Sequence, residues 1–118
     1  MLKHSKLGLK GVEIAVDFLQ NKGYNILHRN WRSGQKEIDM IGIKDNVLVI
    51  FEIKARSTLD FGFPEEAVNK KKQKFLKIGA AAFIQQNPQY EIIRFDIISI
   101  IIEADKAKEI VHFEEAFY

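Results

Sequence analysis

Two β-rich segments in the middle of the chain, Glu37–Ile43 and Val47–Lys54, are separated by only three residues. This spacing predicts a tight antiparallel hairpin. Because successive side chains of a strand point to opposite faces, the apolar residues of both segments divide between the two sides of the hairpin. A hairpin that is apolar on both faces must be covered on both faces, which predicts a sheet enclosed between helices.

The flanking segments predict those helices and the rest of the sheet. Apolar residues recur at helical spacing from Leu7 to Asn21, and a second helix is predicted from Pro64 to Gln86, because proline suits the first helical position. Residues 24–31 and 90–102 predict further strands, and residues 110–117 a short last segment. The order is α-β-β-β-α-β with a C-terminal appendage, an α/β fold in which helices flank a mixed central sheet.

Length and composition narrow the class of protein. A chain of 118 residues predicts one domain, residues 1–118, with one hydrophobic core. Cysteine is absent, which excludes disulfides and thiolate metal sites, and no apolar run is long enough to cross a membrane. The N-terminus has no secretory signal, so we expect a cytoplasmic protein without a membrane partner. The net charge of +2 permits nucleic-acid binding without requiring it.

The register of the hairpin decides where its charged residues lie. If the turn is centred on residues 45–46, the numbers of paired residues sum to 91. Asp39 then falls opposite Glu52, and Glu37 falls opposite Lys54. A loop of odd length would instead place the two acids on opposite faces, because a slip of one residue turns every side chain over.

Two acids that face one another at the edge of an apolar surface require a compensating cation. Carboxylate oxygens are hard ligands and favour Mg²⁺ or Mn²⁺. We therefore expect Asp39 and Glu52 to bind a metal ion. Lys54 lies on the same face and would orient a water molecule or neutralise developing charge in phosphodiester hydrolysis. The alternative is that these are solvated residues at a strand end, since Glu-x-Lys is common in strands.

Asp39, followed after twelve residues by Glu52-Ile-Lys54, resembles the PD-(D/E)xK nuclease signature of archaeal Holliday junction resolvases. More of the chain resembles the YraN family, also known as UPF0102, to which endonuclease activity has been attributed. The matching segments follow the family's order: Gly8–Gly11, Gly23–Leu27, Arg29–Arg32, Glu37–Asp39, Phe51–Arg56, Phe61–Pro64, Ala67–Val68 with Lys72–Gln73, and Arg94–Asp96. The resemblance implies a restriction-endonuclease-like fold with an αβββαβ core and metal-dependent cleavage of DNA by Asp39, Glu52 and Lys54.

One position departs from the family pattern. The family carries glutamate directly after the second glycine of its N-terminal helix, where this chain has Val12. The next residue, Glu13, shares a helix face with Asp17 and points away from the apolar stripe, which predicts exposure to solvent and not metal binding. The departure removes a helix-borne acid from the pattern and favours weak catalysis.

Other polar residues are candidates for nucleic-acid contact. The apolar stripe predicted for the second helix consists of Val68, Phe75, Gly79, Ala82 and Phe83. Lys72 lies on this stripe, so its ammonium must reach a polar site, and with Gln73 it matches a Lys-Gln pair of the family. Arg56 continues the side-chain alternation of Glu52 and Lys54, and Arg32 adds positive charge near the sheet. We expect all four to lie near the DNA.

The remaining candidates are given structural roles. Arg94 and Asp96 are two residues apart in a predicted strand and are interpreted as a structural ion pair. Trp31 is interpreted as an aromatic residue of the core or its rim. The histidines have no ligand spacing and are assigned no role.

Three functions stay open. The first is an enzyme: an Mg²⁺- or Mn²⁺-dependent endonuclease that acts on DNA, with branched or flapped DNA as candidate substrates. Symmetric cutting of two strands would require a homodimer. The second is a catalytically weak or inactive nucleic-acid-binding module of the same fold, which Val12 favours. The third is a structural or protein-interaction domain. Metal binding separates the first from the third, and turnover separates the first from the second.

Overall fold

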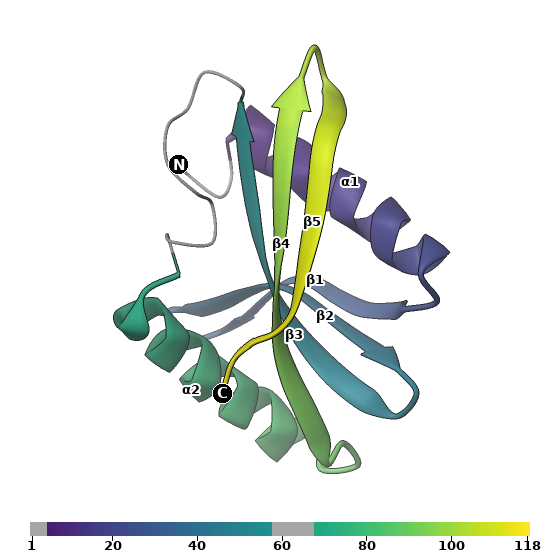
Figure 1. Ribbon diagram of the computed structural model, residues 1–118. Helices are drawn as coiled ribbons and strands as arrows, with labels where there is room; N and C mark the ends of the chain where they lie inside the picture. The colour runs from purple at the N-terminus through teal and green to yellow at the C-terminus, as the bar shows by residue number, and fades with distance from the viewer. Residues whose placement is uncertain (1–4, 58–67) are drawn as a thin grey trace.

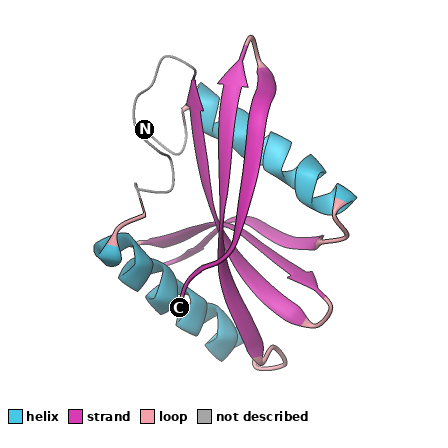
Figure 2. Ribbon diagram, in the orientation of Figure 1, coloured by secondary structure: helices cyan, strands magenta, loops and turns pink. Residues whose placement is uncertain are grey.

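The computed structural model describes residues 5–57 and 68–118 (Figure 1). Within these ranges the elements are α1 (Lys6–Asn21), β1 (Asn25–Ser33), β2 (Lys36–Lys44), β3 (Val47–Ser57), α2 (Lys70–Gln86), β4 (Ile92–Glu103) and β5 (Lys106–Phe117). The strands form one sheet in the order β1-β2-β3-β4-β5, in which only β3 and β4 are parallel. The predicted α/β fold with a mixed sheet flanked by helices is confirmed (Figure 2). Neither helix described here is long and apolar enough to span a bilayer.

The β2–β3 turn has the conformation that the hairpin prediction requires. Asp45 and Asn46 both have positive φ, at 53° and 66°. Two consecutive positive φ angles are typical of a type I′ turn, whose twist matches that of the strands it joins. The observed pairs run from Lys44–Val47 to Met40–Phe51, and the predicted register is confirmed for these five pairs.

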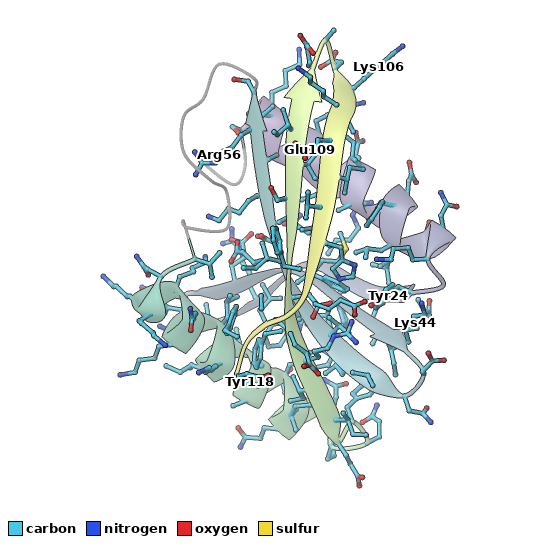
Figure 3. All side chains as sticks on the ribbon, in the orientation of Figure 1. Tyr24, Lys44, Arg56, Lys106, Glu109 and Tyr118 are labelled. Carbon is cyan, nitrogen blue, oxygen red and sulfur yellow. The ribbon has the colours of Figure 1, made fainter. Side chains whose placement is uncertain are left out.

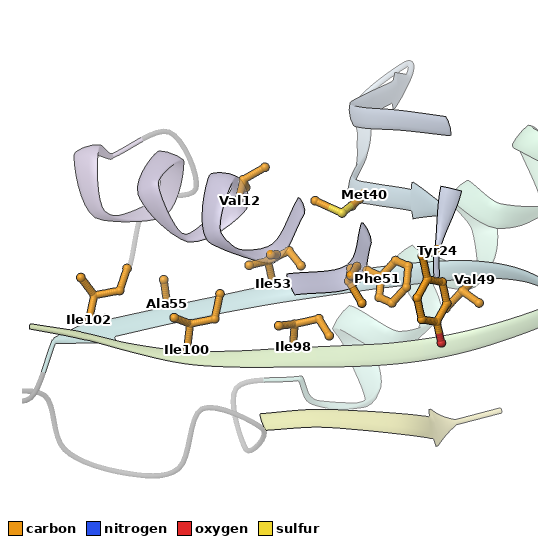
Figure 4. Close-up of a cluster of buried hydrophobic side chains, with 12 residues drawn as sticks. Val12, Tyr24, Met40, Val49, Phe51, Ile53, Ala55, Ile98, Ile100 and Ile102 are labelled. Carbon is orange, nitrogen blue, oxygen red and sulfur yellow. The ribbon is translucent and has the colours of Figure 1, made fainter. Parts of the chain in front are cut away.

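Each face of the sheet is covered by one helix. On one face α1 packs on β3, β1 and β4, over a cluster of buried residues: Val12, Ala15, Leu19, Tyr24, Met40, Val49, Phe51, Ile53, Ala55, Ile98, Ile100 and Ile102 (Figure 4). On the other face α2 packs mainly on β2 and β1. Its cluster includes Ile38, Leu48, Ile50, Leu76, Phe83 and Ile97. The prediction that the hairpin is enclosed on both faces is confirmed.

The close approach of α1 to β3 depends on Gly11. A Cβ atom added there would lie 2.6 Å from the Cβ atom of Ala55, well inside van der Waals contact. We expect Gly11→Ala to lower the free energy of unfolding by about 1–3 kcal/mol, the usual effect of overpacking. Denaturant unfolding measures the change. In the double variant Gly11→Ala/Ala55→Gly the clash is removed, so most of the lost stability should return; a double variant no more stable than Gly11→Ala would contradict this packing.

The second helix differs from its prediction at the N-terminus and in its buried stripe. It begins at Lys70, because the side chain of Asn69 accepts a hydrogen bond from the amide of Lys72 and caps the helix. The predicted start at Pro64 lies outside the described residues, but Val68 and Asn69 are not helical. A loop is also predicted from Ser57 to Phe63; Ser57 is instead the last residue of β3, and the rest of that loop lies outside the described residues. The buried residues are Leu76, Gly79, Ala80 and Phe83, whereas Phe75 is 39% exposed. Because Val68 precedes the helix, its spacing to Phe75 does not place these two residues on one helix face.

The predicted C-terminal appendage is wrong, because it forms a full strand of the sheet. β5 has 12 residues and pairs with β4 from Glu103–Lys106 to Phe95–Phe117. A second turn with consecutive positive φ angles, at Ala104 and Asp105, joins the two strands. Phe113 and Phe117 extend the apolar surface on the α2 side of the sheet.

Candidate functional site

The sheet divides where β2 and β3 part. Their pairing ends at Met40–Phe51, although β2 extends back to Lys36 and β3 runs on to Ser57. Beyond that point β2 remains paired with β1, and β3 remains paired with β4. In Figure 1, β3 and β4 continue together toward the top while the β1–β2 hairpin turns toward α2. The first residues beyond the last pair are Asp39 and Glu52.

The carboxylate of Asp39 lies between the diverging strands. Its Oδ2 atom accepts a hydrogen bond of 2.8 Å from the amide of Ile53, so a side chain replaces the backbone carbonyl that an uninterrupted ladder would supply. The predicted backbone pairs Asp39–Glu52 and Glu37–Lys54 are therefore wrong, although the strands are adjacent and antiparallel as predicted. Asp39 is 5% exposed and is held against the residue that follows Glu52.

Glu52 is buried, at 1% exposure, and has a cationic neighbour. The Nζ atom of Lys72 lies 3.5 Å from its Oε2 atom. Lys72 reaches inward from the first turn of α2, one helical turn before the buried Leu76. The predicted position of Lys72 on the inner stripe is confirmed, and part of the charge compensation predicted for the acids comes from this lysine.

Lys54 and Arg56 follow Glu52 on the same face of β3. Leu48 and Ile50 pack in the α2-side cluster, so the alternation of the strand places residues 52, 54 and 56 on that side too. Both cations are half-buried. Figure 3 shows Arg56 far along β3, at the end of the sheet remote from the β2–β3 turn. We call Asp39, Glu52, Lys54 and Lys72 the fork site.

Two other predicted residues border the fork site less directly. The side-chain amide of Gln73 donates a hydrogen bond of 3.3 Å to the carbonyl of Val68, at the start of α2. Arg32 lies on the β1–β2 hairpin, where its guanidinium is 3.1 Å from the carboxylate of Glu37 and its side chain is 61% exposed. Arg32 is thus an exposed cation on the β1–β2 hairpin, which diverges from β3 at the fork site.

The residues of the fork site fit a small divalent cation. Asp39 and Glu52 offer two buried carboxylates and no nitrogen or sulfur donor, a donor set that suits Mg²⁺ or Mn²⁺. Among the described residues no group of three or more acidic, histidine or cysteine side chains could hold a metal ion. Two carboxylates are sufficient for Mg²⁺, which usually keeps several water molecules and binds substrate phosphate as well.

The helix position at which the resemblance implies glutamate is apolar in this structure. Val12 is 6% exposed and belongs to the α1-side cluster, while Glu13 is exposed on the outer face of α1. The predicted exposure of Glu13 is confirmed. Neither residue adds a carboxylate to the fork site.

A second polar cluster lies on the opposite face of the sheet, under the C-terminal end of α1. Asp96, which is fully buried, accepts hydrogen bonds from Arg94 at 2.8 and 2.9 Å and from Nε2 of His112 at 2.7 Å. The Nδ1 atom of His112 lies 2.7 Å from Nζ of Lys22, and Arg94 also donates to the hydroxyl of Tyr24. We call these five residues the buried network. The predicted Arg94–Asp96 ion pair is confirmed.

The buried network shifts the ionisation of its members. Burial acts to raise the pKa of Asp96, but the hydrogen bonds from His112, Arg94 and the amide of Glu115 outweigh it and leave that pKa below its ordinary value. Burial raises the pKa of Tyr24, which the hydrogen bond from Arg94 offsets only in part. The carboxylate of Asp96 raises the pKa of Arg94. Asp96 is therefore an anion held by its neighbours.

Two features near these clusters carried no signal in the sequence. His112 reaches Asp96 because the β4–β5 register pairs it with Ile98, whereas the predicted last segment, residues 110–117, was not paired with any strand. Ser99 is 6% exposed and is the β4 partner of Lys54, so it borders the fork site on the same face. Only the parallel β3–β4 register, which follows the crossover through α2, places a serine there.

Comparison with known proteins gives one consistent result. The family model described as "Uncharacterised protein family UPF0102" matches residues 11–100. A UPF0102 protein of Flavobacterium psychrophilum is 44% identical over 118 residues, covering 100% of this chain and 98% of that protein. A UPF0102 protein of Bacteroides fragilis is 41% identical over 118 residues, covering 100% of this chain and 97% of that protein. One of Syntrophomonas wolfei is 41% identical over 113 residues, covering 95% of this chain and 97% of that protein.

Proposed function

The chain belongs to the UPF0102 family, and from this premise and the fork site we propose that it is a metal-dependent endonuclease that hydrolyses phosphodiester bonds of DNA. One observation carries the proposal: two buried carboxylates lie where β2 and β3 part, with Lys72 against one of them. Buried acids are unfavourable unless their charge is compensated, so the burial of Asp39 and Glu52 favours a cation-binding role over that of solvated residues at a strand end. The PD-(D/E)xK resemblance of Asp39, Glu52 and Lys54 supports the same reaction.

Each residue of the fork site has a distinct part in the proposed reaction. Asp39 and Glu52 would hold the cation, and the amide of Ile53 fixes the carboxylate of Asp39 in place. When bound, Mg²⁺ or Mn²⁺ would act as a Lewis acid toward the phosphate and lower the pKa of a water molecule bound to it. Lys54 orients the attacking water or neutralises charge on the phosphate. Lys72 holds Glu52 through its ion pair and lies at the edge where phosphate would enter.

The proposal is tested with the purified protein on linear, flapped and four-way DNA in Mg²⁺ or Mn²⁺. Cleavage that requires the metal ion is the expected result. Absence of cleavage on all three substrates with either metal would make the non-catalytic nucleic-acid-binding module the better description. The specific observation in favour of that second function is the buried Val12, which leaves α1 without the family's glutamate.

DNA binding should depend steeply on salt. Arg32, Lys54, Arg56 and Lys72 are the cations we expect at the phosphates, and each neutralised phosphate contributes about −0.9 to the slope of log affinity against log salt. Four contacts predict roughly a hundredfold loss of affinity between about 50 and 200 mM salt. Fluorescence anisotropy with a labelled duplex measures this. Arg56→Gln should make the slope less steep by about 0.9, the contribution of one phosphate contact.

A matched variant provides the control for this slope. Lys77 is an exposed cation of α2 that does not face the sheet, so Lys77→Gln should leave the slope unchanged. Equal flattening by both variants would mean that net charge, and not the fork-site face, governs binding. Affinity that does not respond to salt would contradict a nucleic-acid role.

A further inference from the structure

A pocket of about 560 Å³ lies on the α2 side of the sheet and has no part in the proposed reaction. Its lining comes from the start of α2, from β4 and from the end of β5: Val68, Gln73, Ile97, Phe113, Glu114, Ala116 and Phe117. Val68, Ile97 and Phe117 are buried, and Phe113 is half-buried. The pocket therefore has an apolar, aromatic floor, and Gln73 adds a polar side chain at its rim.

The pocket is adjacent to the fork site. Ile97 in its floor is the β4 register partner of Glu52, and neighbouring strands lie about 4.8 Å apart. Gln73 on its rim follows Lys72, whose Nζ atom is 3.5 Å from Glu52. A DNA strand with a phosphate at the fork site would therefore pass the mouth of the pocket.

The lining suits a nucleobase better than a phosphate. Among the described lining residues none is a cation, and the carboxylate of Glu114 lies 3.9 Å from the guanidinium of Arg94 in the buried network. Phe113 and Phe117 offer aromatic faces or edges to a flat heterocycle, and bases stack on aromatic side chains irrespective of sequence. The amide of Gln73, oriented by its bond to Val68, can meet the hydrogen-bonding edge of a base.

We propose that this pocket receives an unpaired nucleobase from the strand whose phosphodiester lies at the fork site. The proposal rests on the proposed function and narrows its substrate to DNA with an unpaired nucleotide beside the cleavage point. A base inside a duplex must unstack before it enters a pocket, which requires a few kcal/mol, whereas an unpaired base requires least. The pocket thus selects bulged, flapped or forked DNA over continuous duplex.

The test compares binding without turnover, in Ca²⁺, of a duplex and of the same duplex with one unpaired fluorescent adenine analogue. We expect wild type to bind the bulged DNA roughly tenfold more tightly and to quench the analogue, because a stacked base gains about 1–3 kcal/mol. Phe113→Leu keeps an apolar side chain in the pocket but removes the ring, and should lose most of the preference and the quenching. Phe75→Leu, which changes a half-exposed phenylalanine outside the pocket, should retain both.

The outcomes distinguish failure of this proposal from failure of the endonuclease proposal. Equal affinity for the two DNAs, or a preference that survives in Phe113→Leu, overturns the base pocket and leaves metal-dependent cleavage standing. A preference lost in Phe113→Leu but present in Phe75→Leu supports the pocket even in a protein that does not cleave. Binding to neither DNA at low salt overturns both. Thermal unfolding of Phe113→Leu confirms that a lost preference does not reflect unfolding. Gln73→Ala gives a second variant, which removes the amide at the rim and should weaken the preference while it leaves both rings in place.

Discussion

Asp39→Ala and Glu52→Gln are each expected to reduce Mg²⁺-dependent cleavage of DNA by about a thousandfold or more. The metal contributes several kcal/mol of transition-state stabilisation, and each 1.36 kcal/mol corresponds to a factor of ten in rate. Both substitutions remove a proposed metal ligand, so metal affinity measured by calorimetry should fall together with the rate. DNA binding should survive or improve, since each variant removes a negative charge that lies near the phosphates.

Two further variants separate the proposed roles. Lys54→Ala should slow cleavage but spare metal binding, because its ammonium would act on water or phosphate and not on the metal. Glu13→Ala is the matched acidic control: this residue is exposed on α1, so its loss should change neither property. A loss of activity in Glu13→Ala as complete as in Asp39→Ala would show that Glu13 takes the role of the family's helix glutamate. Retained metal binding in Asp39→Ala and Glu52→Gln would rule out the fork site as the metal site.

Removing the carboxylate of Asp96 is expected to have the largest effect on stability. Asp96→Ala leaves Arg94 largely buried without its anion and breaks the hydrogen bonds to His112 and to the amide of Glu115. Breaking a buried ion pair by deleting one partner lowers the free energy of unfolding by about 3–5 kcal/mol. Urea unfolding measures it. Glu103→Ala on the same strand is the control, because it removes an exposed ion pair with Lys108 and should change stability by about 1 kcal/mol or less.

The stability due to Asp96 should also depend on pH in a defined direction. Because the pKa of Asp96 is lower in the folded than in the unfolded chain, its contribution is present above the ordinary value of about 3.9. The contribution is lost as pH falls through the folded-state pKa. The difference in stability between wild type and Asp96→Asn should therefore be constant near neutral pH and shrink below about pH 4. A difference that stays constant down to pH 2 would contradict the network.

The hairpin and the two-sided covering of the sheet could be predicted because both are local properties of the sequence. The turn at Asp45 and Asn46 fixes five pairs, and the alternation of β3 assigns each side chain to a face. The strand nature of β5 could not be predicted from its own composition. Its residues are largely exposed and charged, since an edge strand has little apolar surface to bury, and its place in the sheet depends on the partner β4.

The residue types of the fork site could be predicted, but not their geometry. The spacing of Asp39, Glu52 and Lys54 follows from one register, yet that register ends one residue before the acids meet. A strand separation depends on what each strand pairs with on its other side, here β1 and β4, and neither is encoded in the hairpin. The inward orientation of Lys72 could be predicted because a lysine on an apolar stripe must reach a polar partner. Its ion pair with Glu52 confirms this orientation.

The division of the sheet also bears on the kinetics of folding. The β2–β3 hairpin closes over a turn of two residues and can form within microseconds, whereas the parallel β3–β4 pair joins residues such as Glu52 and Ile97 across the whole of α2. Asp39 and Glu52 are thus brought near each other early, but Lys72, Ser99 and the floor of the neighbouring pocket arrive only with the non-local step. A nascent chain that has made only its hairpins carries both acids together with Lys54, but lacks Lys72, which holds Glu52 in the folded protein. The proposed fork site is therefore completed late in folding, when the crossover through α2 closes.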